Sequence, residues 1–466
     1  MERELIQTAH AAGIPLPPLQ ARIQGRVILP GDPAYDPSRQ SWNLSADPRP
    51  AMIVMAQNTA DVAEAARYAG QAHLELAVQS TGHGFYRSAE GSLLIVTSRM
   101  KTIRIDREAR TAWIGAGAKW GEVLAKTQAV GLAPLLGSSP DVGVVGYTLG
   151  GGLGWLGRKY GLAADSVLRF ELVTANGQLL YASADEHSDL FWGLRGGGGS
   201  LGIVTGMEIR LYPVTTVYGG TLFYPVQAAG EVFARYRDWI AAAPDELTSS
   251  IVLMNFPPIP LVPENLRGQS FVMVRGCWCG PIEQGRTLVQ PWRAWRAPLI
   301  DDFKEMPFSQ VGAISDEPVD PLPVFTTGAW MRALPDDAVE PLIRHCVQGP
   351  SPVLFAEVRH AGGAIARVPS GAAAFGNRDA ALLLLLLGLT PTPEAHAALV
   401  GHCQRIMAAL RPHLTGGVYL NFLEGEEARQ RVKDAYTPEA YARLMQLKGA
   451  YDPHHRLRSG FVHREE

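Results

Sequence analysis

Cysteine is scarce in this sequence, with four residues in a chain of 466. Cysteines this sparse and scattered do not form a disulfide framework. Cys277 and Cys279 lie on either side of Trp278 in a predicted strand, so their thiols share one face and are a possible start of a metal site. No second Cys/His pair at useful spacing completes it, and Cys346 and Cys403 are isolated. We therefore expect ordinary buried thiols and no metal.

Net charge and long hydrophobic runs are scarce as well. The formal charge is −3 without an acidic or basic block, so no nucleic-acid partner is expected. Residues 1–13 lack the apolar stretch of a signal peptide. The most apolar run, 382–387, lies in a segment about half as long as a bilayer-spanning helix, so we interpret it as a buried central strand. These absences predict a cytoplasmic protein without a membrane partner.

Glycine and proline, in contrast, are abundant, with 49 and 34 residues spread between periodic segments. The length and the 47% of hydrophobic residues predict two packed cores. Residues 1–46 are predicted to form an arm, a helix followed by a loop. Residues 47–213 alternate strands, helices and glycine clusters, whereas beyond Pro213 the clusters disappear. This organisation is typical of an α+β enzyme with two domains.

The first domain is predicted to begin with a strand at 52–55 and a helix that Thr59 caps and Gly70 ends. Residues 79–84 are small and favour a tight turn after the next strand. Asn176 and Gly177 between two apolar runs predict a hairpin. The remaining predicted elements are strands at 74–78, 93–96, 102–106, 111–117, 170–174, 178–181 and 203–212, and a helix at 120–130.

The second domain is predicted to be an antiparallel sheet covered by helices on one side. Its clearest strands are expected at 270–279, 353–358 and 381–387, with a helix at 226–242. No internal repeat is present.

Two glycine clusters, at 137–154 and 196–199, are the first residues that indicate chemistry. Backbone N–H groups approach a diphosphate closely only where no side chain intervenes, and consecutive N–H groups form an anion nest. Neither cluster has the form of a Rossmann dinucleotide site, and a Walker lysine is absent. A phosphate-bearing ligand is therefore expected, although tight turns without a ligand would also produce such clusters.

Several motifs, in the same order, resemble the berberine-bridge-enzyme-like oxidases of the vanillyl-alcohol-oxidase superfamily. They are QSTGHG at 79–84, LLIVTSRM at 93–100, RKYGLAAD at 158–165, DLFWGLRGGGG at 189–199, YLNF at 419–422 and KGAYDP at 448–453. The resemblance covers nearly the whole chain after residue 25. It implies a PCMH-type FAD-binding domain at 47–213, a substrate-binding domain at 214–411, and a C-terminal segment at 412–466 that returns to the FAD domain.

His83 matches the histidine through which this family bonds FAD, by an imidazole nitrogen and the flavin 8α-methyl carbon. The resemblance implies that this bond raises the redox potential of the flavin, which eases substrate oxidation. The alternative is that His83 only packs or hydrogen-bonds in its turn. The residues that the resemblance assigns to FAD binding are Gln79, Ser80, Thr81, Gly82, His83, Gly84, Ser139, Val142, Gly143, Gly146, Tyr147, Gly150, Gly151, Gly154, Gly202, Ile203 and Val204.

Three positions depart from the family pattern. Ser139 stands where many relatives carry a second flavin-bonding cysteine, so we expect a single covalent link. Leu153 stands where a tyrosine often lies near the substrate. The strand in which some relatives carry an acid or amide is represented by the leucines at 382–387. Two usual proton-handling groups are therefore expected to be absent.

Tyr419 is then the first candidate for the general base, with Asn421 as its positioning partner. The pKa of a phenol, near 10, must be lowered, for example by a neighbouring cation, before the phenol can act at neutral pH. Glu424 and Glu426 are alternatives, and His360 is a weaker one. Tyr419 as a strand residue packed between the domains is the competing interpretation.

The implied reaction is transfer of a hydride from a substrate C–H to flavin N5 while a base removes a proton from the attached oxygen or nitrogen. Val142 lies where the family lines the oxygen-facing side of the flavin, and its modest size favours dioxygen as acceptor, with hydrogen peroxide as product. Leu153 and 382–387 favour an apolar or aromatic alcohol, amine or other secondary metabolite. Two alternatives stay open, namely a dehydrogenase with a non-oxygen acceptor and a non-redox, flavin-carrying cyclase or binding protein.

Overall fold

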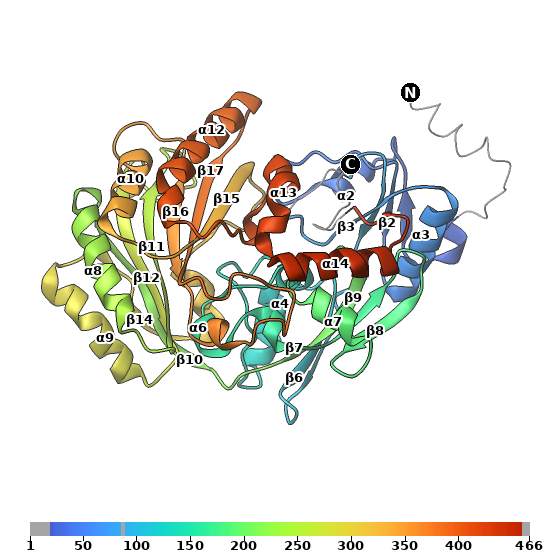
Figure 1. The fold of residues 1–466 in the computed structure, drawn as a ribbon, viewed down its shortest axis with the longest axis horizontal. Coiled ribbons are helices and arrows are strands. Elements are labelled where there is room, and N and C mark those ends of the chain that lie inside the picture. The colour runs from blue at the N-terminus through green and yellow to red at the C-terminus, as the bar shows by residue number, and fades with distance from the viewer. Residues whose placement is uncertain (1–18, 85–88, 459–466) are drawn as a thin grey trace.

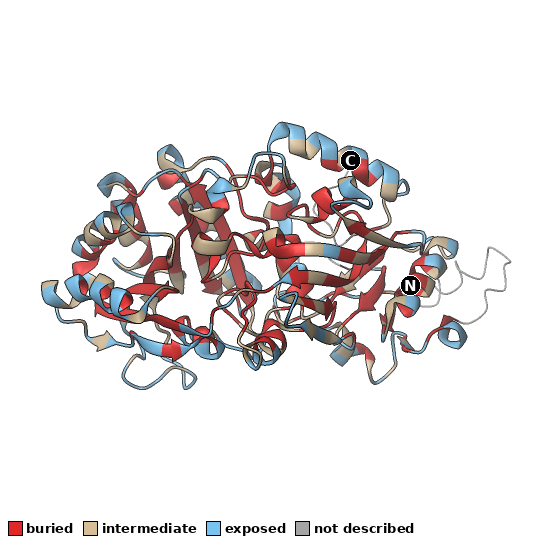
Figure 2. Ribbon diagram, turned by 90° about the horizontal axis from the view of Figure 1, so that it is seen from below, coloured by how far each residue is buried: buried red, intermediate tan, exposed pale blue. Residues whose placement is uncertain are grey.

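The computed structural model of the protein describes residues 19–84 and 89–458. A large sheet with its helices forms one end of the elongated molecule, and two smaller sheets lie at the other end (Figure 1). The strands are mostly buried, whereas the helices carry most of the exposed residues (Figure 2). The chain contains both many helices and many strands, so the predicted α+β class is confirmed.

The first small sheet has the strand order β1 (Arg26–Ile28), β2 (Met52–Met55), β4 (Leu93–Val96) and β3 (Leu76–Gln79). β4 pairs in parallel with β2 and β3, because the chain from β2 to β3 crosses over as helix α3 (Thr59–Gln71). β1 adds to β2 in antiparallel orientation. The prediction that residues 1–46 hold only a helix and a loop is therefore wrong at β1, whose three residues are too few to show a periodic pattern.

Helix α3 differs slightly from its prediction. The side chain of Asn58, and not that of Thr59, accepts the N–H of Asp61 at 3.0 Å and so caps the helix. The helix also continues through Gly70 to Gln71. The predicted apolar face is confirmed as fully buried: Val62, Ala65, Ala66 and Ala69.

The second small sheet is antiparallel, in the order β5-β6-β9-β7-β8. The predicted hairpin at Asn176 and Gly177 joins β7 to β8, and the φ of +80° at Gly177 explains why glycine stands there. The strands are β5 (Ile103–Asp106), β6 (Thr111–Gly115), β7 (Val167–Val173), β8 (Leu179–Ser183) and β9 (Ile203–Arg210). The helices of this part are α2 (Tyr35–Arg39), α4 (Trp120–Gln128), α5 (Val144–Leu149), α6 (Gly157–Tyr160) and α7 (Ser188–Leu194).

The large sheet is antiparallel and has eight strands, in the order β13-β10-β12-β11-β16-β17-β15, with β14 also paired to β10. Its strands are β10 (Thr216–Pro225), β11 (Leu247–Asn255), β12 (Ser270–Trp278), β13 (Ile300–Asp301), β14 (Lys304–Pro307), β15 (Val324–Met331), β16 (Phe355–His360) and β17 (Leu382–Leu389). The helices α8 (Ala229–Ala241), α9 (Ile282–Trp295), α10 (Asp336–Cys346) and α12 (Pro393–Leu410) cover one face (Figure 1). The predicted one-sided sheet is confirmed.

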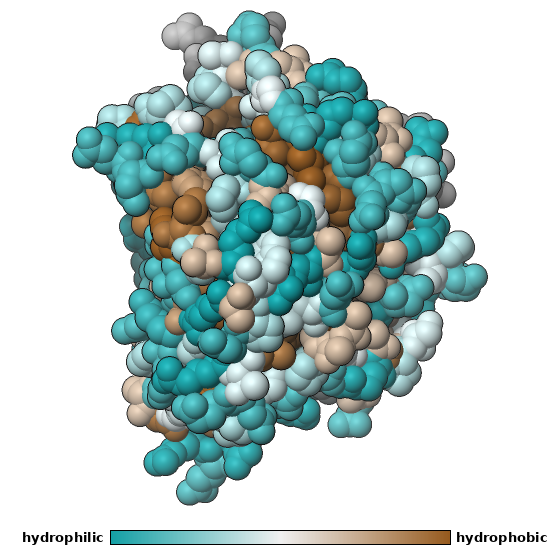
Figure 3. Space-filling view, turned by 90° about the vertical axis from the view of Figure 1, so that its left-hand side faces the viewer, coloured by the Kyte–Doolittle hydropathy of each residue, from teal (hydrophilic) through white to brown (hydrophobic). Residues whose placement is uncertain are grey.

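The surface of this end is mostly hydrophilic, with two hydrophobic patches near the top of the view (Figure 3). The leucine run lies in β17, between β16 and β15, as the predicted buried central strand. None of the helices in the described part of the chain is both long enough and apolar enough to span a membrane.

The C-terminal segment leaves the large sheet and packs on the part that holds the small sheets. Helix α13 (Gly425–Arg431) follows the YLNF motif, and α14 (Pro438–Tyr451) contacts α7. Beyond α14, Leu457 forms a parallel bridge with Leu76 at the edge strand β3. Residues more than 370 apart in sequence are thereby joined in one sheet, since the two bridge positions are 76 and 457.

Candidate active site

The turn after β3 is held by the N-terminal arm. The backbone N–H of Trp42 donates to the carbonyl of Thr81 at 3.0 Å, and that of Asn43 donates to the carbonyl of Gly82 at 3.1 Å. Gly82 has a φ of +73°, and a Cβ there would lie 2.7 Å from the Cα of Ser41. Only glycine permits this close approach of the arm to the turn. The arm therefore sets the shape of the predicted flavin turn.

His83 lies at the end of this turn as a neutral imidazole. Its Nδ1 pairs with Thr81 Oγ1 at 2.9 Å, and its ring stacks on Trp42 with 4.5 Å between centroids and 13° between planes. Burial lowers the pKa of His83 to about 4. The negative charge of Asp141 raises this pKa and the positive charge of Lys119 lowers it, but both effects are smaller than that of burial. Nε2 is buried and has no hydrogen-bond partner among the described residues. A neutral, oriented imidazole with an unpartnered nitrogen is suited to nucleophilic attack.

A second turn, which contains Ser139, Val142 and Gly143, closes against the first. A Cβ on Gly143 would lie 3.3 Å from the hydroxyl oxygens of Ser80 and Thr81, so a side chain there would push the two turns apart. Ser80 Oγ is buried without a partner in the part of the chain that the structure describes. On the helix that follows, α5, Gly146 is exposed and a Cβ would meet nothing within 4 Å. The two turns thus lie against each other, and the helix that follows has no side chain at its exposed position 146.

The glycine run after α5 is anchored by the YLNF motif. The hydroxyl oxygen of Tyr419 accepts the N–H groups of Gly152 at 3.1 Å and Leu153 at 3.0 Å. Asn421 Nδ2 donates to the same oxygen and to the carbonyl of Tyr147, both at 3.0 Å. Both predicted catalytic residues therefore contact the predicted flavin segment, although they are more than 260 residues away in sequence.

The environment of Tyr419 does not lower its pKa. Its side chain is 2% exposed, and burial raises the pKa of the phenol above its ordinary value despite the N–H donors and the positive charge of Arg359. Arg359 is the neighbouring cation that was expected from the sequence, but the effect of burial on the pKa is larger than the effect of its charge. Tyr419 is consequently a neutral phenol at neutral pH.

Leu153 and most of the leucine run face cores. Leu153 and Leu383 pack with Tyr419 in one buried cluster, and Leu382, Leu384 and Leu386 pack under the helices of the large sheet. These leucines therefore give no direct support for an apolar substrate.

Charged groups are present on the uncovered face of the large sheet, where the sequence led us to expect none. The carboxylate of Glu357 on β16 accepts from Ser250 Oγ at 2.6 Å and from Arg359 Nε at 2.7 Å, and lies 3.6 Å from Arg275 Nη1. Burial raises the pKa of Glu357, but the two arginines and the serine outweigh it and hold the pKa below its usual range. Glu357 is an ionised, buried carboxylate.

The sequence prediction concerned the leucine run in β17, whereas the acid lies on the neighbouring strand β16. A usable signal exists, because Glu357 lies in the predicted strand 353–358 and Arg359 is one residue beyond it. The observed strand includes both, and residues two positions apart share a face. His360 points the other way. Its Nε2 pairs with Arg158 Nη1 at 2.9 Å, and burial lowers its pKa to about 3, which favours a structural role.

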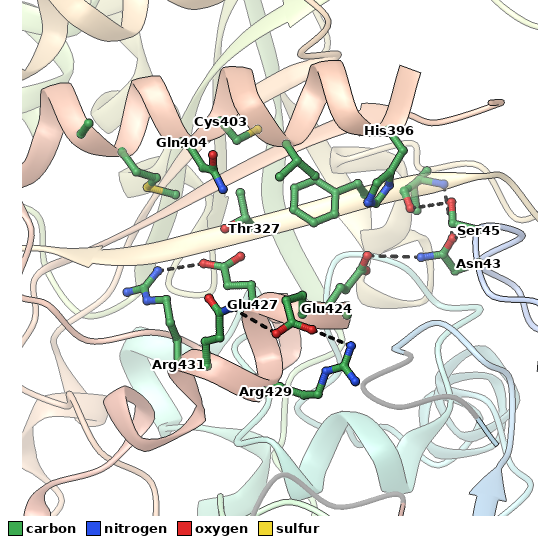
Figure 4. A pocket seen from close by; sticks show the side chains of 18 of the residues that line it. Asn43, Ser45, Thr327, His396, Cys403, Gln404, Glu424, Glu427, Arg429 and Arg431 are labelled. Atoms are coloured by element: carbon green, nitrogen blue, oxygen red, sulfur yellow. Dashed lines mark hydrogen bonds and ion pairs between the residues drawn. The ribbon is translucent and has the colours of Figure 1, made fainter. Parts of the chain in front are cut away.

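The alternative carboxylates lie elsewhere, at a cavity of about 1070 Å³ between α12, β15 and α13 (Figure 4). Glu424 Oε2 accepts from Asn43 Nδ2 at 3.4 Å, and burial raises its pKa to about 8. Glu426 pairs with Arg429 at 2.5 Å and is exposed. Neither forms a hydrogen bond with His83 or Tyr419 in the described residues, and the same holds for Glu357.

The predicted adenine-side residues begin strand β9 and are buried. A Cβ on Gly202 would lie 2.6 Å from Leu172 Cδ1, and Ile203 packs in the core between α3 and the first sheet. This placement explains the glycine by packing. The described residues contain no group of three His, Cys, Asp or Glu side chains arranged to hold a metal ion.

The comparisons with known proteins bear on this site. A family model described as "FAD binding domain" matches residues 50–183. Over 458 residues the chain is 30% identical to (R)-6-hydroxynicotine oxidase of Paenarthrobacter nicotinovorans, covering 94% of this chain and 96% of that protein. The chain belongs to the FAD-linked oxidoreductases. An FAD-linked oxidoreductase of Dictyostelium discoideum is 25% identical over 437 residues, covering 92% of each chain.

Solved structures agree with this family of FAD-linked oxidoreductases. The crystal structure of 6-hydroxy-D-nicotine oxidase from Arthrobacter nicotinovorans superposes with a TM-score of 0.85 at 27% identity, covering 96% of this chain and 99% of that one. A variant of BBE-like 1 from Physcomitrella patens gives the same TM-score at 22% identity, with the same coverage, and shows the shared fold. The predicted resemblance to berberine-bridge-enzyme-like oxidases is confirmed. This FAD-linked oxidoreductase is an enzyme.

The residues at the two turns fit FAD. The turns hold two buried polar atoms without partners in the described residues, Ser80 Oγ and His83 Nε2, and Gly143 brings the second turn close to Ser80. Backbone turns free of side chains suit a diphosphate, and a neutral imidazole suits a bond to the flavin ring. The structure thus provides what the family's cofactor requires.

Proposed function

We propose that this FAD-linked oxidoreductase is an oxidase with a single covalent flavin link through His83. The observation that carries the proposal is the neutral imidazole of His83, fixed by Thr81 and Trp42 with Nε2 unpartnered in the described residues. Ser139 offers no thiol for a second link. The similarity to (R)-6-hydroxynicotine oxidase supports the same class of chemistry.

Bound FAD supplies a hydride acceptor at N5 and passes two electrons on to an external acceptor. The chain holds the turns, orients the substrate and accepts the proton that the substrate's O–H or N–H group loses. The residues proposed to contact FAD are those that the family resemblance assigns. They lie in the turn 79–84, in the segment from Ser139 to Gly154, and at Gly202, Ile203 and Val204. The proposed domain division is an arm at 1–46, then 47–213, 214–411 and 412–466.

Dioxygen is the proposed acceptor, taking two electrons and two protons to form hydrogen peroxide. Val142 is half-buried and adds only a side chain of modest size to the second turn, which supports this choice. An apolar or aromatic alcohol or amine is the proposed substrate, because the half-buried side chains of Met254, Phe256 and Phe355 lie on the same face of the large sheet as Glu357.

Substrate-dependent peroxide formation tests this function. Purified protein is expected to be yellow, to lose its flavin absorbance anaerobically with an oxidisable alcohol or amine from a small aromatic panel, and to regain it in air with one peroxide per turnover. Bleaching without reoxidation by air would show a dehydrogenase. A flavin that no member of the panel bleaches would contradict the redox function and favour the cyclase or binding role.

The proton acceptor is assigned by a pH profile. Tyr419 as the base stays a prediction, whereas its raised pKa and its three N–H donors argue for positioning of the glycine run. A Tyr419 base requires the phenolate, so kcat would rise with pH towards and beyond about 10. A Glu357 base is already ionised, because its pKa is held below 4.5, and gives a flat profile between about pH 6 and 9.

Two variants separate these assignments. Tyr419→Phe keeps the ring but removes the acceptor oxygen for Gly152 and Leu153, and Glu357→Gln keeps the shape but removes the charge. We expect a flat wild-type profile and a loss of about 10²-fold or more in kcat for Glu357→Gln, the usual size for a general base. A wild-type profile that climbs steadily to pH 10 and disappears in Tyr419→Phe would assign the base to Tyr419.

A further inference from the structure

The cluster on the uncovered face of the large sheet contains more positive than negative charge. Ser250 on β11 is in register with Arg275 on one side and with Arg359 on the other, so both arginines extend from the same row as Ser250. The only carboxylate that pairs with either guanidinium within 4.0 Å in the described residues is that of Glu357. Two cations therefore share one anion.

The two arginines differ in what surrounds them. Arg275 is 5% exposed, lies 3.6 Å from Glu357 and donates to the carbonyl of Ser315 at 3.3 Å, so it is enclosed by the protein. Arg359 is less enclosed, with 15% of its side chain exposed. Besides its bond to Glu357, Arg359 donates from Nη2 to Ser138 Oγ at 3.5 Å, which is a weak hydrogen bond.

Arg359 also points at the candidate flavin site. Ser138 belongs to the glycine-rich turn that precedes Gly143, and the guanidinium of Arg359 lies 5.3 Å from the ring centroid of Phe422 in the YLNF motif. Its positive charge acts on the phenols of Tyr147 and Tyr419, and Glu317, a half-buried acid on the loop after β14, acts on it from a distance. The charge left over by the pairing with Glu357 is thus presented beside the flavin turns.

The same sheet face continues into an apolar cluster. Val252 is the register partner of Glu357, and Phe355 stands two positions before Glu357 on β16. Both belong to a cluster in which Phe355, Met254 and Phe256 are half-buried. An apolar surface therefore adjoins the charged row.

We propose that Arg359 binds a carboxylate of the substrate, so that the substrate of this enzyme is an apolar or aromatic molecule with a carboxylate group. The proposal rests on the proposed oxidase function, whose substrate class it narrows. Besides its proposed role as the proton acceptor, Glu357 holds the Arg359 guanidinium through its Nε, and Arg275 in turn pairs with Glu357. The Nη groups of Arg359 keep only the weak contact with Ser138, so they can donate to a ligand. A guanidinium matches a carboxylate with two parallel N–H donors.

The test compares two ligands of the same shape, 2-naphthoate and its neutral amide, 2-naphthamide. Binding to the oxidised holoenzyme is followed by the change in flavin absorbance and by calorimetry. Wild type is expected to bind the carboxylate about 10-fold or more tightly than the amide, the lower range for a hydrogen bond to a charged group. Equal affinities, or no binding of naphthoate at about 1 mM, would overturn the proposal.

Variants of the cluster should change the preference for the carboxylate over the amide in opposite directions. Arg359→Gln should abolish the preference for the carboxylate, and Arg359→Lys should restore part of it, because the charge returns without the planar fork. Glu357→Gln should increase the preference and should make naphthoate raise the thermal unfolding temperature more than in wild type. A purely structural role for the cluster would weaken both ligands alike in all three variants and would overturn the proposal.

Arg378→Gln is the matched control. Arg378 is also a buried arginine, but both its Nη groups donate to the carboxylate of Asp165, so its charge is already compensated. Its loss should leave the naphthoate preference unchanged. Calorimetry does not need a flavin signal. A colourless protein that still prefers naphthoate would therefore contradict the proposed function but not this inference. An active oxidase that does not prefer naphthoate to naphthamide would contradict this inference but not the proposed function.

Discussion

The variant His83→Ala is expected to release all its flavin into the supernatant on acid precipitation, whereas the wild-type pellet stays yellow. The reason is that His83 is the residue at the turn whose ring nitrogen is buried, neutral at its pKa of about 4 and without a partner in the described residues. Ser139 cannot replace it, since a hydroxyl is a poorer nucleophile than an imidazole. The absorbance of pellet and supernatant measures the result directly.

Trp42 supplies a graded control for the same link. Its ring stacks on His83, while its backbone N–H holds the turn independently of the side chain. Trp42→Phe should keep most of the flavin in the pellet, and Trp42→Ala should leave a mixture, because the imidazole loses the surface that orients it. Yellow colour retained in the pellet of His83→Ala would show that another residue forms the bond.

The second large effect is expected at the buried ion pair of the C-terminal segment. Lys448 and Asp452 are 0% and 1% exposed and lie 2.7 Å apart, and Lys448 Nζ also donates to the carbonyls of Ser200 and Leu457. Lys448→Met leaves the Asp452 carboxylate buried without its cation, which should reduce the free energy of unfolding by about 3–5 kcal/mol. The shift of the urea unfolding midpoint, with an unchanged slope, measures the loss.

Arg344→Met is the control, because Arg344 and Glu340 form a pair with the same spacing of four residues but are 52% and 62% exposed. Its cost should stay within about 1 kcal/mol. Similar losses in both variants would contradict the argument from burial.

The pH dependence of the pair has a defined sign. Burial raises the pKa of Asp452, but Lys448 and the N–H groups of Leu457 and Arg456 outweigh it, so the pKa lies below its ordinary value. The contribution of Asp452 to stability is therefore complete above its unfolded pKa of about 3.9 and is lost as the pH falls through the lower folded value.

Local signals in the sequence predicted much of the fold. The strands 52–55 and 93–96 were predicted with the correct bounds, and the hairpin at Asn176 and Gly177 was predicted from its turn residues alone. These features depend on residues near in sequence, whose alternation or turn conformation is visible in a short window. Thr59 was mistaken for the cap of α3 because Asn58 beside it is equally able to cap.

Contacts between distant segments were beyond that kind of signal. Three contacts join elements that are far apart in sequence: Trp42 stacks on His83, Tyr419 accepts a hydrogen bond from Gly152, and Arg275 pairs with Glu357. The pKa of Tyr419 depends on burial, which follows from the packing of all the elements around it. The direction of that pKa shift therefore required the folded structure.

The sequence by itself determined that the chain is an FAD-linked oxidoreductase and predicted a flavin turn that contains His83, because ordered motifs and glycine-rich turns are properties of the covalent chain. Only the tertiary structure decided which groups share the site and in which charge state. It placed Arg359 beside the turns with its charge incompletely compensated by Glu357, and it left Tyr419 neutral. Charge compensation and desolvation depend on distances in space, which the order of residues does not contain.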